Sequence, residues 1–186
     1  MCDKYNIFKM NKNESVKLKL KSKLKKIKIV LTDVDGVLTD GGRYYTSSGE
    51  KFKKFHVRDG MGINLLLKNN VKTIIVTKEK SKIVHKWASD MNVSKIIMGS
   101  IYKEKELSKI SEEFKVDASE IAFIGDDVND MKLMKIVGLA IAPKDGNRNA
   151  QLIADYVCNE KGGKGAFREV ADLILSEKIP KNKDWY

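Results

Sequence analysis

The feature that most constrains the fold of this chain is an alternation of short, branched apolar runs with longer segments of helical periodicity. The apolar runs predict buried strands at residues 27–32, 73–77, 95–98, 121–125 and 139–142, with a shorter candidate at 156–158. Helical spacing predicts helices at 61–70, 81–91, 103–114, 128–137, 147–154 and 167–175, the first of them capped by Asp59. Strands that alternate with helices imply a parallel sheet with helices on both faces.

The region after the first strand departs from this alternation. Residues 42–46 and 51–55 flank the turn-like tetrad Ser47-Ser48-Gly49-Glu50, which predicts a β-hairpin. We therefore predict an α/β fold: a Rossmann-like parallel sheet with helices on both faces, plus a small hairpin flap. Such sheets bind ligands outside the carboxyl ends of their strands, so functional residues are expected directly after strands.

The length of 186 residues suits one domain with short extensions. We expect a Lys-rich extension at 1–26, a catalytic domain at 27–176 and a tail at 177–186. Residues 1–28 hold ten lysines against Asp3 and Glu14, so +8 of the net charge of +11 lies there and +3 on the rest. The extension is interpreted as solvated and poorly ordered; an anion-binding arm or a membrane-surface contact are the alternatives.

The composition also limits the cellular compartment and the kinds of partner that we expect. No apolar run approaches the roughly 20 residues of a membrane helix, so no membrane span is expected. Cys2 and Cys158 are too few for a disulfide framework or a zinc site, and a cytoplasmic location fits best. The body has little net charge and no evident groove of aromatic and basic residues, so nucleic acid is not the expected partner.

Acidic residues follow two of the predicted strands. Asp33 and Asp35 come directly after 27–32, and alternation along an extended segment points their side chains the same way. An EF-hand is excluded because Gly is fourth, not sixth, in this run and Tyr44 stands where Glu is needed. The segment Gly125-Asp126-Asp127-Val128-Asn129-Asp130 follows 121–125. Each cluster alone fits an ordinary turn, but two at one sheet edge can share a hard cation, and oxygen ligands favour Mg²⁺.

Two further groups complete a candidate site. Thr77 ends the strand at 73–77 and offers a hydroxyl, and Lys103 opens a helix after 95–98 and offers a positive charge. A carboxylate nucleophile, a metal, a hydroxyl and a lysine are the groups that phosphoryl transfer requires.

With these residues in place, the chain resembles the haloacid-dehalogenase-like hydrolase superfamily over about residues 27–175. The matching motifs are DVDGVLTD at 33–40, Thr77 after IIV, Lys103 and GDDVND at 125–130. The resemblance implies a phosphoric monoester hydrolase. Asp33 would be the nucleophile that forms an aspartyl-phosphate, and Asp35 the acid and base. Asp33, the main-chain carbonyl of Asp35 and Asp126 would hold Mg²⁺, Asp127 and Asp130 would support the metal, and Thr77 and Lys103 would bind phosphate.

The spacing of these motifs leaves no room for a cap domain over the site. The chain therefore resembles the capless branch typified by 3-deoxy-D-manno-octulosonate 8-phosphate phosphatase, which includes phosphatases of sialic-acid-type 9-phosphates. The segments HVRDGMG at 56–62 and GGKGAFRE at 162–169 support this likeness. By that resemblance the substrate is a phosphorylated sugar acid and the enzyme a homotetramer.

The same resemblance brings five residues near the substrate: Arg58, Asp59, Glu79, Lys164 and Arg168. A Gly-rich turn with Lys and Arg suits a sugar-acid carboxylate, although GGKG is equally an ordinary helix-entry loop. Glu79 stands where octulosonate phosphatases usually carry Arg, which points toward the 9-phosphate phosphatases; an acid at a helix start is the plain alternative.

Two other functions compete with this hypothesis. The basic extension suggests a DNA 3′-phosphatase of the same superfamily, whose activity would fall steeply with salt. A non-catalytic oligomerisation partner of a sugar-nucleotide synthetase is the alternative from another class, although every catalytic position is filled.

Overall fold

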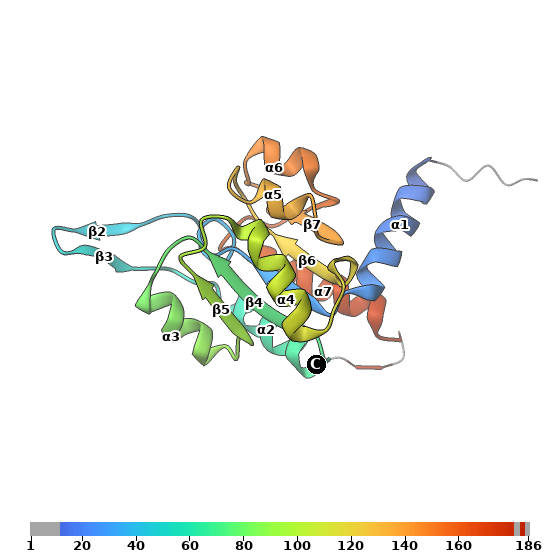
Figure 1. Ribbon diagram of the computed structural model, residues 1–186, viewed down its shortest axis with the longest axis horizontal. Helices are drawn as coiled ribbons and strands as arrows, with labels where there is room; N and C mark the ends of the chain where they lie inside the picture. Colours follow the sequence, from blue (N-terminus) through green and yellow to red (C-terminus); the bar gives the residue numbers. More distant parts are fainter. Residues whose placement is uncertain (1–11, 181–182, 185–186) are drawn as a thin grey trace, which may run out of the picture.

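The computed structural model describes residues 12–180 and 183–184, and it confirms the predicted α/β fold (Figure 1). Its main sheet has six parallel strands in the order β5-β4-β1-β6-β7-β8. Their bounds are β1 Ile29–Thr32, β4 Lys72–Thr77, β5 Lys95–Met98, β6 Ile121–Ile124, β7 Leu139–Ala142 and β8 Tyr156–Val157. All six match predicted apolar runs, and Cys158 follows β8 as a buried free thiol. Cys2 lies outside the described residues.

Strand β1 occupies the middle of the sheet and is buried along its whole length. It pairs with β4 on one side and β6 on the other, with Thr32 opposite Ile75 and Ile124. Since these three strands are parallel and in close register, the segments that follow them emerge at the same edge. This register brings the two predicted acidic clusters together.

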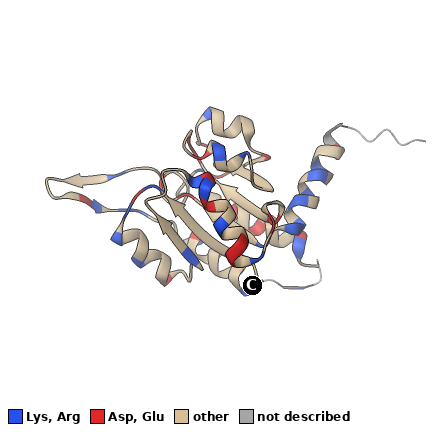
Figure 2. Cartoon of the chain, viewed as in Figure 1, with Lys and Arg blue, Asp and Glu red and all other residues tan. Residues whose placement is uncertain are grey.

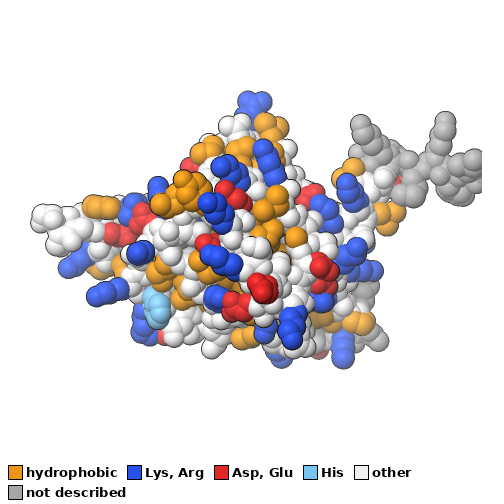
Figure 3. Space-filling model, viewed as in Figure 1, with side chains coloured by type: hydrophobic (Ala, Val, Ile, Leu, Met, Phe, Trp, Pro, Cys, Tyr) orange, Lys and Arg blue, Asp and Glu red, His pale blue; other side chains and the backbone are white. Residues whose placement is uncertain are grey.

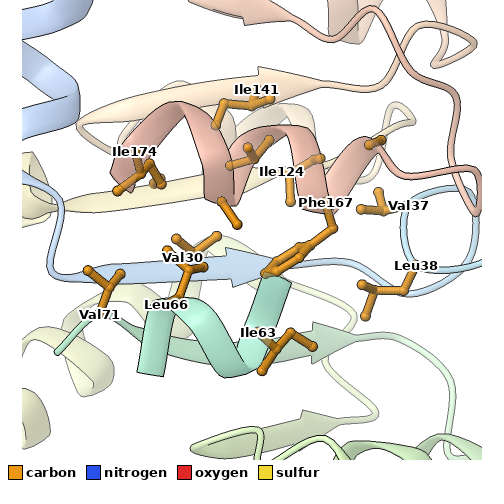
Figure 4. Close-up of a cluster of buried hydrophobic side chains, with 14 of the residues drawn as sticks. Val30, Val37, Leu38, Ile63, Leu66, Val71, Ile124, Ile141, Phe167 and Ile174 are labelled. Carbon is orange, nitrogen blue, oxygen red and sulfur yellow. The ribbon is translucent and has the colours of Figure 1, made fainter. Parts of the chain in front are cut away.

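Helices cover both faces of the sheet. Their bounds are α1 Lys12–Lys26, α2 Val57–Lys68, α3 Lys82–Asp90, α4 Glu106–Phe114, α5 Met131–Met134, α6 Arg148–Ile153 and α7 Ala166–Lys178. On one face, α2 and α7 pack against each other and against the sheet, through Val30, Leu66 and Phe167 among others (Figure 4). On the other face, apolar residues of α4, α5 and α6 pack over Leu31, Ile74 and Phe123.

The predicted hairpin is formed by β2 (Tyr44–Thr46) and β3 (Gly49–Phe52) and extends away from the body (Figure 1). Gly49 has a φ of +104° at its turn, a conformation that favours glycine. Tyr44, Tyr45 and Phe52 are more than half exposed. The chain passes from β3 directly into α2 and from β4 through α3 into β5, so no cap domain lies among the described residues.

The structure corrects the interpretation of the Lys-rich extension. Residues 12–26 form α1, which packs on α7 and places Leu24 in the core with 1% of its surface exposed. Residues 14–19 of α1 are exposed, including Val16 and Leu18. The prediction of a poorly ordered extension is therefore wrong for residues 12–26. Leu24 and the half-buried Leu20 give this helix apolar contacts with the core. Residues 1–11 lie outside the described part.

Two helices, α2 and α5, differ most from their predicted bounds. Helix α2 begins at Val57 with His56, not Asp59, as its N-cap residue. The helix expected at 128–137 shortens to α5, since the Asp130 carboxylate accepts hydrogen bonds from the amides of Asp126 and Asp127 and holds the preceding residues in a turn. None of the helices that the structure describes is long and apolar enough to span a membrane.

Candidate active site

The acidic residues predicted from two separate strands meet at the carboxyl edge of the sheet. Asp33 follows β1, and Asp126 and Asp130 follow β6. One carboxylate oxygen from each of the three lies within 4.8 Å of the others. Asp33 is 7% exposed and Asp130 is fully buried, so the cluster is held in a poorly hydrated position.

Lys103 supplies positive charge inside this acidic cluster. Its Nζ lies 2.7 Å from Asp33 Oδ2 and 2.6 Å from Asp130 Oδ1, and the residue is only 1% exposed. It is brought there by a short 3₁₀ turn, Lys103–Lys105, that precedes α4. Burial lowers the pKa of Lys103, but the charges of Asp33 and Asp130 outweigh this effect and raise it, so the side chain is an ammonium.

One lysine does not neutralise three carboxylates. Burial, together with the negative charges of Asp33 and Asp130, raises the pKa of Asp126 to about 7. Burial also raises the pKa of Asp33, to about 6, although Lys103 opposes that shift. Carboxylates whose charged forms are this costly create a strong demand for another cation. Their oxygen-only donor set fits Mg²⁺.

Asp127 and Asp130, the expected metal supports, occupy different environments. Asp127 is exposed, and its Oδ1 accepts a hydrogen bond from the Val128 amide at 2.8 Å. Asp130 is buried between Lys103 and the backbone of the loop, where Oδ2 accepts from the Asp126 amide at 3.0 Å. This contact fixes the loop that carries Asp126.

Asp35 and Thr77 flank the cluster. Asp35 is partly exposed, and its Oδ1 lies 2.6 Å from Nζ of Lys53, a buried hairpin residue that sequence analysis did not select. Thr77 ends β4 with 2% of its surface exposed, and its hydroxyl accepts a hydrogen bond from the Glu79 amide at 3.3 Å. No sequence signal separates Lys53 from its neighbours Lys51 and Lys54, since all three lie in one lysine-rich stretch.

Three of the five expected substrate residues lie together, apart from the acidic cluster. Arg58, Lys164 and Arg168 line a cavity of about 530 Å³ between the start of α2 and the start of α7. Neither Asp33 nor Asp126 lines it. Arg168 Nε is already 2.7 Å from Asp172 Oδ1, which leaves Arg58 and Lys164 as the more available cations of this cavity.

Asp59 and Glu79 are engaged elsewhere. Asp59 is fully buried, and its Oδ1 accepts a hydrogen bond from the Arg168 amide at 2.8 Å, so it secures the first turn of α7. This burial does not fit the expectation that Asp59 contacts substrate directly. From the sequence, Asp59 was also expected to cap its own helix, whereas it caps α7. Glu79 is half-buried and forms an ion pair at 2.7 Å with Arg43, which directly precedes β2.

The Gly-rich segment before α7 packs against the loop that carries the two β1 aspartates. The Gly163 amide donates to the Val37 carbonyl at 2.8 Å, and the Gly162 amide donates to Asp145 Oδ1 at 2.9 Å. A Cβ on Gly162 would lie 1.9 Å from the Gly36 carbonyl oxygen, so only glycine permits this approach. Residues 162–163 thus support the loop that carries Asp33 and Asp35.

Charge elsewhere on the molecule is dispersed. Figure 2 shows blue positions repeated along α1 and acidic positions at the strand ends. On the face seen in Figure 3, Lys and Arg side chains are scattered among acidic and apolar ones. The acidic centre is therefore a local feature of a basic chain.

The fold and this site together define a capless α/β hydrolase with a carboxylate centre. A family model for the haloacid dehalogenase-like hydrolases matches residues 7–169, and the chain belongs to that family. The family resemblance inferred from the motifs is thereby confirmed.

Relatives of known function and known structure agree with this assignment. The chain is 37% identical over 156 residues to the 3-deoxy-D-manno-octulosonate 8-phosphate phosphatase of Haemophilus influenzae, covering 84% of this chain and 87% of that protein. A cobalt-bound structure of the Haemophilus influenzae phosphatase matches with a TM-score of 0.82 at 37% identity, covering 84% of this chain and 91% of that one. The phosphatase of Moraxella catarrhalis, solved with magnesium, phosphate and the sugar acid, matches with a TM-score of 0.84 at 34% identity, covering 90% and 94%.

Proposed function

We propose that this chain is a Mg²⁺-dependent phosphatase of a phosphorylated 2-keto-3-deoxy sugar acid, acting through an aspartyl-phosphate. The relatives are phosphatases, which confirms the predicted enzyme class of phosphoric monoester hydrolase. The observation that carries the proposal is the convergence of Asp33, Asp126 and Asp130 around Lys103 at the carboxyl ends of β1 and β6.

Asp33 is the proposed nucleophile. Its carboxylate oxygen forms a bond to phosphorus while the bond from phosphorus to the substrate's ester oxygen breaks. Asp35 donates a proton to the departing alcohol and then takes a proton from the water that attacks the aspartyl-phosphate. That second displacement releases inorganic phosphate and restores the Asp33 carboxylate. Two roles for Asp35 require a side chain that is held in place, and its contacts with Lys53 and Thr39 support this.

The remaining residues are proposed to balance the negative charge around the phosphoryl group. Asp33, the main-chain carbonyl of Asp35 and Asp126 would hold Mg²⁺, with Asp127 and Asp130 in support. The metal would neutralise the carboxylates and the phosphoryl oxygens so that two anions approach each other. Thr77 and Lys103 would bind phosphoryl oxygens. Thr77 ends β4 at the same edge of the sheet as Asp33, and Lys103 contacts Asp33 directly.

Substrate choice is proposed to depend on a second copy of the chain. A site without a cap is open to water, and a neighbouring subunit is one way to close it. The exposed Tyr44, Tyr45 and Phe52 of the hairpin offer apolar surface for a homotetramer. Arg58, Lys164 and Arg168 are the proposed anchors for the sugar-acid carboxylate, and Glu79 the residue that separates octulosonate 8-phosphate from nonulosonate or sialate-type 9-phosphates. A cytoplasmic location is part of the same proposal.

The test is phosphate release from a panel, with Mg²⁺ and with chelator. The panel holds an octulosonate 8-phosphate, two nonulosonate 9-phosphates, an aryl phosphate and a 3′-phosphorylated oligonucleotide. We expect metal-dependent turnover that is fastest on one sugar-acid phosphate. Fastest turnover on the oligonucleotide, falling with salt, would instead establish the DNA 3′-phosphatase. No turnover on any substrate by folded protein would leave the synthetase partner as the better account.

A further inference from the structure

Five charged side chains of alternating sign connect Asp35 to the hairpin and then to the loop after β4. Lys53 Nζ lies 2.6 Å from Asp35 Oδ1 and 3.1 Å from Glu50 Oε1. Arg43 continues the series, with Nε 3.2 Å from Glu50 Oε1 and Nη2 2.7 Å from Glu79 Oε2. The series spans three segments: the loop after β1, the hairpin with the residues that flank its two strands, and the loop after β4.

Lys53 is the member of this series whose burial is most unusual. Its side chain is 0% exposed, although lysine is almost never fully buried unless it is paired. Burial lowers its pKa, but hydrogen bonds to Asp35 and Glu50 outweigh that effect and raise it. The neighbouring Lys54 is a natural contrast, since its side chain is 55% exposed and lies 3.9 Å from Asp40. An ion pair like that of Lys54 contributes little, whereas removal of a buried partner is costly.

The contacts of Asp35 are one-sided. Lys53 and the Thr39 hydroxyl, at 3.3 Å, both approach Oδ1. Within the described part of the chain, no hydrogen bond or ion pair uses Oδ2. Lys53 therefore restrains the rotation of the carboxylate and leaves Oδ2 without a partner among the described residues, so that this oxygen can exchange a proton with a leaving group.

We propose that Lys53 is a positioning residue for Asp35, and that the Glu50–Arg43–Glu79 ion pairs hold the hairpin where Lys53 can act. Proton transfer to the leaving alcohol then depends on a docked hairpin. This inference rests on the proposed function, because it assigns Lys53 to the step in which Asp35 protonates the departing oxygen. It gives Arg43 and Glu50 a role that the sequence did not suggest.

The nature of the leaving group provides a readout that a purely structural role would not change. A positioned general acid contributes about 10²–10⁴-fold when the leaving group is a basic alkoxide. A p-nitrophenolate leaves without needing a proton. Loss of Asp35 positioning should thus slow turnover of an alkyl sugar phosphate far more than turnover of p-nitrophenyl phosphate.

The experiment compares Lys53→Met with the matched control Lys54→Met, on a sugar-acid phosphate and on p-nitrophenyl phosphate with saturating Mg²⁺. For Lys53→Met we expect kcat on the sugar phosphate to fall about 10–100-fold with little change in KM, and kcat on p-nitrophenyl phosphate to fall less than about 3-fold. Lys54→Met should behave as wild type. Lys53→Arg should recover part of the lost activity, and Arg43→Ala should show the same selective loss at a smaller size.

Two results would overturn the inference. An equal loss on both substrates would show that Lys53 only supports the fold, and wild-type kinetics on both would show that Asp35 needs no such support. A further variant, Asp35→Asn, distinguishes a failure of the inference about Lys53 from a failure of the proposed function. If Asp35→Asn abolishes sugar-phosphate turnover while Lys53→Met leaves it at the wild-type rate, only the inference about Lys53 is wrong; if Asp35→Asn is harmless, the proposed function is wrong as well. Should Lys53→Met not fold, Arg43→Ala provides the same test.

Discussion

Two groups of lysines in this protein occupy opposite environments. Lys103 and Lys53 have side chains that are 1% and 0% exposed, and each contacts two carboxylates. By contrast, Lys17 and Lys19 of α1 are exposed, and the lysines of this helix that form ion pairs do so at the surface, as Lys21 does with Glu177 at 3.3 Å. More than half of the net charge of +11 thus lies in α1, with seven lysines against Glu14, whereas the proposed chemistry depends on two buried lysines elsewhere.

Among the substitutions that test this comparison, the largest effect on stability is expected at Lys103. Lys103→Met leaves Asp33 and Asp130 buried without their cation, so we expect the free energy of unfolding in chelator to fall by about 3–5 kcal/mol. Mg²⁺ should restore part of this stability but not turnover. Denaturant unfolding with and without Mg²⁺ measures the effect. Lys109→Met, which removes a lysine that is 71% exposed, is the control and should change stability by less than about 0.5 kcal/mol.

The next effect concerns whether α1 belongs to the folded body. Leu24→Ala removes a side chain that is 1% exposed, and we expect a loss of about 2–4 kcal/mol in the free energy of unfolding. The neighbouring Lys25→Ala, on the exposed side of α1, should cost less than about 0.5 kcal/mol. Equal effects of the two substitutions in thermal or denaturant unfolding would contradict the packing of α1 on α7.

A smaller effect is the pH dependence of the metal-free protein. The folded pKa values of Asp33 and Asp126, about 6 and about 7, lie above the ordinary value of 3.8. A raised carboxyl pKa means that the folded state binds protons more tightly than the unfolded state. The stability from these groups is therefore complete below pH 4 and is lost as pH rises to 7.

Asp126→Asn should reduce this loss by on the order of 1–2 kcal/mol, since one pKa unit corresponds to about 1.4 kcal/mol and the side chain is partly solvated. Mg²⁺ should raise the Tm more at pH 8 than at pH 5, because it binds the ionised carboxylates. Melting curves across pH measure both effects. A Tm increase on adding Mg²⁺ that is the same at both pH values would refute the acidic metal site.

The smallest effect is expected on the exposed face of α1. The combined substitution of Lys17, Lys19 and Lys26 by Gln should change the free energy of unfolding by no more than about 0.5 kcal/mol and leave kcat on a sugar-acid phosphate unchanged. Loss of sugar-phosphate turnover in this variant would show that α1 takes part in the reaction and would remove the contrast between the two groups of lysines.

The sequence predicted the sheet and the acidic centre for related physical reasons. Buried parallel strands are continuous apolar runs, and their carboxyl ends meet at one edge, so Asp33 and Asp126 had to lie close once β1 and β6 were neighbours. The hairpin was predictable because turn residues separate two strand-like runs. None of these inferences required knowledge of side-chain contacts between distant segments.

What escaped prediction depends on such contacts. The burial of Lys53 follows from the docking of the hairpin beside Asp35, and that of Asp59 from the packing of α2 on α7, neither of which leaves a periodic signal in the sequence. Helix α1 was misjudged because its lysines obscured the apolar contacts that Leu24 and Leu20 make with the core. Local sequence thus predicted the elements, and long-range packing decided which charged residues are buried.

The central claim is that Asp33 is the nucleophile of a metal-dependent phosphatase. The most direct test measures phosphate release from the preferred sugar-acid phosphate by wild type and Asp33→Asn, each with Mg²⁺ and with chelator, after both proteins are shown to be folded. We expect turnover only for wild type with Mg²⁺, and a loss of at least about 10³-fold in Asp33→Asn. Metal-independent turnover, or substantial activity in folded Asp33→Asn, would contradict the account.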